Sequence, residues 1–257
     1  MSVVMVEEQS GVALVTLNRP DANNALNRTL SEAITTTFTE LAGSTTVRAI
    51  VLTGAGRNFC AGVDLKALSE EPELLSTGMG LGPASPIVAA LEHCPKPIIG
   101  AINGAAVTGG FELALACDYL FASTEARFAD THARVGILPG WGLSQKLTRI
   151  IGINRAREMS LAGNFIDAHR AEAWGLVNRV CTPENLMDET LASAAQVADG
   201  DANAVVALKA LMNDGAKQNL GDALLLEGER GNAFAKTVDY SQMGERLAAL
   251  RQRAAKQ

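Results

Sequence analysis

Residues 98–118 constrain the fold more than any other part of this sequence, because they combine a buried strand, two adjacent glycines and a helix. The apolar run Ile98–Ile102 predicts the strand, and Gly109 and Gly110 stand directly before a helix whose first turn carries Glu112. Paired glycines at a helix start let a ligand approach backbone N–H groups that the helix leaves unpaired. The positive potential there would stabilise an oxygen that gains negative charge. The stretch therefore suggests an oxyanion hole beside a base, although the same residues also suit tight packing of a strand against a helix.

Composition narrows the class of protein. The 257 residues are 47% apolar and carry a net charge of −6 without a long basic run, which argues against a nucleic-acid-binding protein. No uninterrupted run of 18 apolar residues predicts a membrane span, and the N-terminal residues lack the pattern of a signal peptide. The four cysteines are widely spaced and the three histidines are scattered, so we expect free thiols and no metal site. These features predict a soluble, cytoplasmic protein.

The order of expected elements indicates an α/β fold with a helical end. Strands are expected at residues 3–6, 12–17 and 47–52, and strand–strand–helix units recur through the first half of the chain. From residue 143 onward the pattern is mostly helical. Asp201-Ala202-Asn203 is the best boundary, so we expect a core over residues 1–200 and a helical region over residues 201–257.

Two glycine-rich segments imitate nucleotide-binding motifs but lack essential residues. Gly54-Ala-Gly56 follows a strand, but Phe59 stands where a dinucleotide fingerprint needs its third glycine. The segment from Gly104 to Gly110 has the spacing of a phosphate-binding loop but lacks its lysine. Neither a dinucleotide nor a nucleoside triphosphate is therefore the expected ligand.

Two other glycine-containing loops, at residues 60–66 and 107–114, each follow a strand. One backbone N–H from each loop, if they converge, would hold a carbonyl oxygen that gains charge. With these loops the sequence resembles the crotonase superfamily, the enoyl-CoA hydratase/isomerase family. The matching motifs extend over most of the chain: V-T-L-N-R-P at 15–20, V-L-T-G-A-G-R-N-F-C-A-G-V-D-L at 51–65, I-N-G-A-A-V-T-G-G-F-E-L-A-L-A-C-D at 102–118, G-I-L-P-G-W-G at 136–142 and A-W-G-L-V-N-R-V at 173–180.

The resemblance implies a crotonase-type spiral of repeated ββα units with a helical C-terminal trimerisation region. It implies an acyl-CoA thioester as substrate, with coenzyme A entering as part of that substrate and no separate cofactor. Assembly as a homotrimer or homohexamer is expected. By position, the backbone N–H groups of Val63 and Gly109 would form the oxyanion hole. Further residues expected to contact the substrate are Arg19, Ala22, Ala61, Asp64, Leu65, Lys66, Gly110, Pro139 and Trp141.

One position departs from the family's hydratases. Glu112 matches the first of their two catalytic glutamates, but His132 stands where the second is expected. His132, with or without Asp130, would deliver a proton, since an imidazole titrates near neutral pH. Alternatively, Glu112 acts alone in dehydration, isomerisation, hydrolysis or decarboxylation of an acyl-CoA, or the chain binds acyl-CoA with little turnover. The leading hypothesis is reversible addition of water to a 2-enoyl-CoA, with Glu112 and His132 as the catalytic residues.

Overall fold

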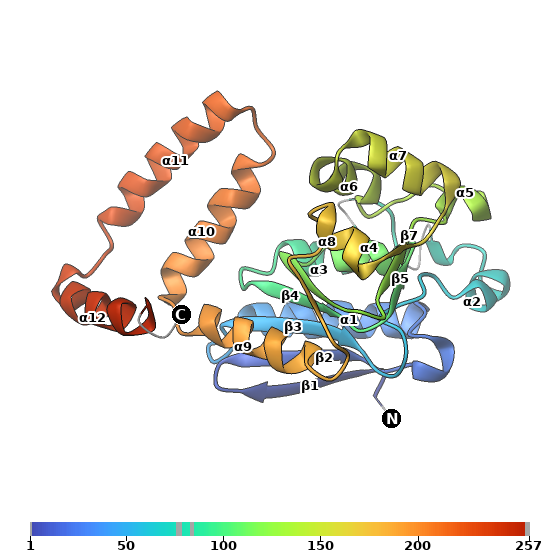
Figure 1. The fold of residues 1–257 in the computed structure, drawn as a ribbon, viewed down its shortest axis with the longest axis horizontal. Coiled ribbons are helices and arrows are strands. Elements are labelled where there is room, and N and C mark those ends of the chain that lie inside the picture. Colours follow the sequence, from blue (N-terminus) through green and yellow to red (C-terminus); the bar gives the residue numbers. More distant parts are fainter. Residues whose placement is uncertain (1, 76–78, 83–84, 255–257) are drawn as a thin grey trace. The chain divides into compact units, whose positions relative to one another are not determined.

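The structure, a computed structural model, describes residues 2–75, 79–82 and 85–254 (Figure 1). The chain divides into two compact units, residues 1–206 and 207–257. The division falls inside helix α10 (Ala202–Gly215), which begins next to the boundary expected from the sequence. In the part of the chain that the structure describes, no helix is long and apolar enough to cross a membrane.

Two sheets form the framework of the first unit. The larger has the order β1-β2-β3-β4-β6-β9, in which β1 and β2 form an antiparallel hairpin and all other neighbours are parallel. The smaller has the order β5-β7-β8. The strands are β1 (Val4–Gln9), β2 (Val12–Leu17), β3 (Ala49–Gly54), β4 (Ile98–Ile102), β5 (Ala105–Val107), β6 (Tyr119–Ser123), β7 (Arg127–Ala129), β8 (Ile166–Asp167) and β9 (Arg179–Cys181).

The ββα repeat predicted from the sequence is present. Strands β4 and β5 lead into α4 (Gly109–Leu115), and β6 and β7 lead into α5 (His132–Val135). Because β4 pairs with β6 and β5 pairs with β7, each successive unit adds one strand to each sheet. The strand–helix junctions of neighbouring units therefore lie on the same side of the fold, and this arrangement positions the candidate site.

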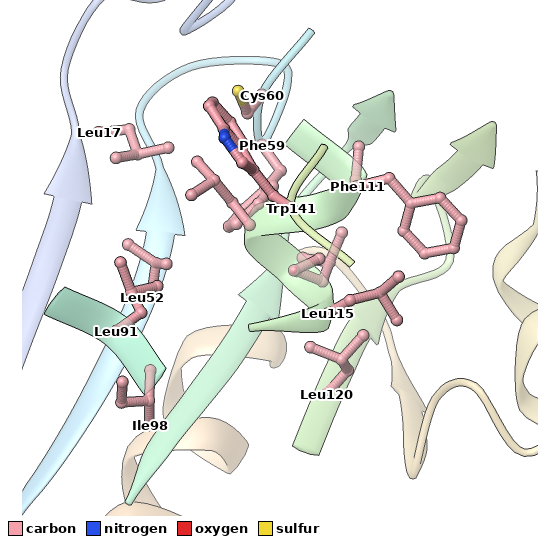
Figure 2. Packing of buried hydrophobic residues seen from close by; sticks show 14 of the residues in the cluster. Leu17, Leu52, Phe59, Cys60, Leu91, Ile98, Phe111, Leu115, Leu120 and Trp141 are labelled. Atoms are coloured by element: carbon pink, nitrogen blue, oxygen red, sulfur yellow. The ribbon is translucent and has the colours of Figure 1, made fainter. Parts of the chain in front are cut away.

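Helices cover both faces of the larger sheet. Strands β3 and β4 are buried along their whole length, as expected for parallel strands covered on both sides. Figure 2 shows Leu52 and Ile98 of this sheet on one side of α4, with Phe111 of α4 pointing away from them. Helix α9 (Leu186–Ala198) packs on the opposite face. The other helices that the structure describes in this unit are η1 (Pro20–Ala22), α1 (Arg28–Gly43), α2 (Leu65–Glu70), α3 (Pro86–Glu92), α6 (Leu143–Ile151), α7 (Ile153–Ala162), α8 (Ala168–Ala173) and the start of α10.

The second unit is helical and carries exposed apolar side chains. It comprises the end of α10, then α11 (Leu220–Ala235), η3 (Tyr240–Gln242) and α12 (Met243–Ala254). Met212 of α10 and Leu225 of α11 are 65% and 74% exposed. Large exposed apolar side chains, when they are contiguous, are typical of an interaction face.

Candidate active site

A cavity of about 600 Å³ lies in the first unit, where the loop after β3 and the start of α4 meet α5 and the segment that follows it. Its lining includes the polar side chains of Glu112 and His132 and the glycines Gly82, Gly109 and Gly140. The remaining side chains are apolar, so the cavity suits an acyl chain whose reactive end lies beside the two polar groups. These apolar residues are Val63, Leu75, Leu81, Ile137, Leu138, Pro139 and Trp141.

The two glycine-containing loops touch at this cavity. A Cβ placed on Gly62 would lie 3.3 Å from the nitrogen of Gly109, so Gly62 permits the close approach. Leu26 donates to the carbonyl of Gly62 at 2.7 Å and accepts from the N–H of Asp64 at 2.8 Å. In such a parallel bridge the N–H of the intervening Val63 points away from Leu26. Val63 and Gly109 line the same cavity.

The adjacent glycines Gly109 and Gly110 have different roles. A Cβ on Gly109 would meet other atoms no closer than 3.5 Å, from Leu26 and Trp141. A Cβ on Gly110 would lie 2.1 Å from the carbonyl oxygen of Cys60. Gly110 therefore lets α4 pack closely against the loop at residues 60–66, whereas Gly109 lies at the cavity. The tight-packing interpretation of the glycine pair therefore applies to Gly110, and ligand approach at Gly109 stays a prediction.

Gly110→Ala is expected to lower the free energy of unfolding by about 2–3 kcal/mol, because the new methyl group meets backbone that cannot rotate away. Chemical denaturation measures the change. Gly43→Ala is the matched control, since a Cβ on Gly43 at the exposed end of α1 meets nothing within 4 Å. Equal stability of the two variants would contradict the packing role of Gly110.

The buried carboxylate of Glu112 is held in a fixed orientation. Its Oε1 accepts hydrogen bonds from the backbone N–H groups of Trp141 at 2.7 Å and Leu143 at 3.3 Å. Its Oε2 lies 3.6 Å from Nε2 of His132. Because both donors to Oε1 are backbone groups, no side-chain pattern in the sequence could reveal them. The carboxylate is thus presented to the cavity with Oε2 directed toward His132.

His132 lies between two carboxylates. Its Nδ1 is 2.6 Å from Oδ1 of Asp130, and its own backbone N–H donates to the same oxygen at 3.1 Å. Burial lowers the pKa of His132, but the interactions with Asp130 and Glu112 outweigh burial and raise that pKa to about 9. Burial raises the pKa of Asp130, but hydrogen bonds led by that from His132 bring it below its usual range. His132 is therefore an imidazolium at neutral pH.

The stability of the protein should fall as the pH rises from about 6.5 to about 9. The folded-state pKa of His132, about 9, exceeds its ordinary value of 6.5. Between these values the folded protein binds more protons than the unfolded chain, so raising the pH favours unfolding. We expect a loss of about 1–3 kcal/mol in urea denaturation. His132→Gln should abolish this loss, and His169→Gln, at an exposed histidine, should retain it. The same pH dependence in the His132 variant would contradict the raised pKa.

Several residues expected to contact the substrate lie together around the start of α2 and are not among the residues that line the cavity; this group is called the rim below. Arg19 donates to Oδ2 of Asp64 at 3.1 Å and to the carbonyl of Ala25. Asp64 also accepts from the N–H groups of Lys66 and Ala67, so it caps α2. Burial raises the pKa of Asp64, but the Ala67 and Arg19 hydrogen bonds lower it overall. The Arg19–Asp64 pair thus braces the rim.

The other rim residues are placed beside that brace. The N–H of Ala61 donates to the carbonyl of Asn23 at 3.0 Å, which brings the 60–66 loop next to the half-buried Ala22. Ala61, Leu65 and Lys66 are exposed. Within the described ranges, no group of three or more His, Cys, Asp or Glu side chains could hold a metal ion.

Comparison with known proteins gives one family. A family model described as enoyl-CoA hydratase/isomerase matches residues 7–252. The probable peroxisomal enoyl-CoA hydratase 1 of Arabidopsis thaliana is 44% identical, over 89% of this chain and 84% of that protein. The short-chain-enoyl-CoA hydratase of Clostridium acetobutylicum is 35% identical, over 92% and 90%. The crystal structure of the Bacillus anthracis enoyl-CoA hydratase has 31% identity and a TM-score of 0.88, and covers 98% of this chain and 96% of that one.

Proposed function

Because this chain belongs to the enoyl-CoA hydratase/isomerase family, we propose that it adds water reversibly across the double bond of a 2-enoyl-CoA thioester. Glu112 and His132 transfer the protons, and the backbone N–H groups of Val63 and Gly109 bind the thioester oxygen. The observation that carries the proposal is the 3.6 Å approach of Nε2 of His132 to Oε2 of Glu112, in the cavity that Val63 and Gly109 also line.

The reaction balances with these groups alone. Glu112 accepts a proton from water as the water oxygen bonds to C3, and the electron pair of the double bond moves onto the thioester oxygen. Val63 and Gly109 stabilise that oxyanion, and losing one such donor typically costs about 2.7–4 kcal/mol of barrier. His132 then donates its proton to C2. Transfer of the proton from Glu112 to the neighbouring His132 restores both groups.

The surroundings of the site support finer parts of the proposal. We assign the rim at Arg19, Ala22 and residues 61–66 to the coenzyme A portion of the substrate, and no other cofactor is required. The exposed apolar residues of α10 and α11 support assembly as a homotrimer or homohexamer. Within the described residues, no disulfide links Cys60, Cys94, Cys117 and Cys181, which suits the cytoplasm.

The contact between His132 and Glu112 also favours a second candidate function. Since His132 contacts carboxylates at both ring nitrogens, it could serve only to orient Glu112. Glu112 would then act as a single base in dehydration, isomerisation, hydrolysis or decarboxylation of an acyl-CoA. If the contacts of Glu112 with Trp141, Leu143 and His132 also prevent it from accepting a proton, the chain would bind acyl-CoA with little turnover.

A panel of CoA thioesters assayed with the purified protein distinguishes these functions. The panel contains 2-enoyl, 3-enoyl, 3-hydroxyacyl, saturated and 2-carboxyacyl thioesters. We expect hydration of a 2-enoyl-CoA, with the reverse reaction on the 3-hydroxyacyl-CoA, to be the fastest conversion. Preferred turnover of another class would support a single-base reaction, and binding without turnover would support the acyl-CoA binder. Either result contradicts the hydratase proposal.

A further inference from the structure

Thr108, the residue before Gly109, has a backbone conformation that β-branched residues rarely adopt. Its φ is +53° and its ψ is −112°. Glycine takes such angles without steric cost, but a threonine there is an outlier that surrounding contacts must hold in place. The other described non-glycine residues with positive φ are Ser10, Asn23 and Asn24, none of them β-branched. Strain of this kind concentrates at functional sites.

Hydrogen bonds hold every polar group of Thr108. Its N–H donates to the carbonyl of Ala129 at 2.9 Å, and its carbonyl accepts from the N–H of Glu112 at 2.9 Å. Its hydroxyl lies 2.5 Å from the hydroxyl of Thr131 and accepts from the N–H of Thr131 at 3.2 Å. Thr108 is buried, so these bonds lie largely out of water.

The hydrogen bond between the hydroxyls of Thr108 and Thr131 connects the residue before Gly109 with the residue before His132. Thr108 precedes Gly109, and Thr131 precedes His132 at the start of α5. The carbonyl of Thr108 and the N–H of Gly109 belong to one planar peptide unit and point in opposite directions. Because the carbonyl is fixed by Glu112 at the start of α4, the N–H of Gly109 is turned away from the helix and toward the preceding loop.

We propose that Thr108 is a positioning residue, which orients the N–H of Gly109 and, through the hydroxyl of Thr131, keeps that N–H in a fixed relation to His132. The proposal rests on the proposed function, since Gly109 and His132 have the roles assigned above. A threonine suits this task better than glycine, because its hydroxyl bond limits the backbone rotation that a glycine would permit. The same bond opposes the strain at Thr108.

The kinetic test uses variants that remove one hydroxyl at constant shape. Thr108→Val and Thr131→Val should each lower kcat for 2-enoyl-CoA hydration about tenfold, with KM within twofold of wild type. Thr108→Ser should recover most of the lost rate. The double valine variant should be little slower than Thr108→Val, because that single change already removes the bond between the two hydroxyls. Thr39→Val, at an exposed threonine of α1, is the matched control.

An infrared measurement separates this proposal from the proposed function. The carbonyl stretch of bound butanoyl-CoA, labelled with ¹³C at the thioester carbon, should shift to lower frequency in wild type and shift less in Thr108→Val at equal affinity. No shift in wild type would overturn the oxyanion hole itself. A full wild-type shift in the valine variants, with kcat within twofold, would overturn the role of Thr108 alone. If Thr108→Val does not fold, Thr131→Val decides by the same two readouts.

Discussion

Replacing Glu112 by Gln is expected to lower kcat for hydration of a 2-enoyl-CoA by about 10²–10⁴-fold, the range typical of a general base. The amide has the shape of the carboxylate, and its oxygen can still accept from the N–H groups of Trp141 and Leu143. It cannot take a proton from water. The fold and the acyl-CoA cavity should therefore persist while the chemical step fails.

Two measurements check this result together. Steady-state hydration gives kcat, and calorimetric titration with butanoyl-CoA, which has no double bond to hydrate, gives the dissociation constant. We expect that constant to stay within about threefold of wild type. Glu125→Gln, at an exposed turn between β6 and β7, is the matched control and should leave both quantities unchanged. Unchanged turnover in the Glu112 variant would remove this residue from the mechanism.

His132→Ala is expected to lower kcat by about 10²-fold or more, because the proton donor to C2 is lost. In wild type the rate should fall as the pH rises through about 9, where the imidazolium loses its proton. Asp130→Asn should move this fall to lower pH, since Asp130 raises the pKa of His132. The measurement is kcat against pH for the three proteins.

The same series can assign His132 to a passive role. A loss of less than threefold in His132→Ala would show that it serves only as scaffold. A fall in rate at the same pH in wild type and Asp130→Asn would mean that another group limits the reaction. The first result would leave Glu112 as the single base, and the second would contradict the assignment of the pH dependence to His132.

Family membership and the repeated ββα architecture follow from the sequence and are confirmed. Long apolar strands such as β3 and β4 were predictable because burial on both faces demands continuous apolar runs. Strands β5 and β8 and helix α5 were not predicted. They are two to four residues long, too short for a periodic pattern, and form only because neighbouring units supply partners.

The residues of the candidate site were easier to predict than the contacts between them. Glu112 and His132 were named from the motif, and the structure brings them into one cavity; their catalytic roles stay predictions. The pairing of His132 with Asp130 depends on a tight turn at the start of α5. The role of Thr108 depends on a backbone angle, which no side-chain type in the sequence indicates. The sequence therefore predicts which residues belong to the candidate site, whereas the orientation of their side chains and backbone groups depends on tertiary packing.

The presence of histidine at position 132 changes the electrostatic interactions among the charged side chains of the site. Two glutamates facing one substrate would repel each other, whereas Glu112 and the His132 imidazolium attract, and Asp130 balances the remaining positive charge. The raised pKa of His132 therefore favours the charged form of the proposed proton donor at neutral pH, beside the proposed base Glu112. The proposed acid is thus a cation between two carboxylates, which raise its pKa, rather than a neutral carboxylic acid.

The most direct test of this account follows labelled water through the reaction. Purified enzyme is incubated with a 2-butenoyl-CoA in H₂¹⁸O and, separately, in D₂O, and the products are analysed by mass spectrometry. Hydration predicts a 3-hydroxybutanoyl-CoA that carries one ¹⁸O at C3 or one carbon-bound deuterium at C2, with coenzyme A still attached. Free coenzyme A with ¹⁸O in a released carboxylate, or recovery of the unlabelled thioester alone, would contradict it.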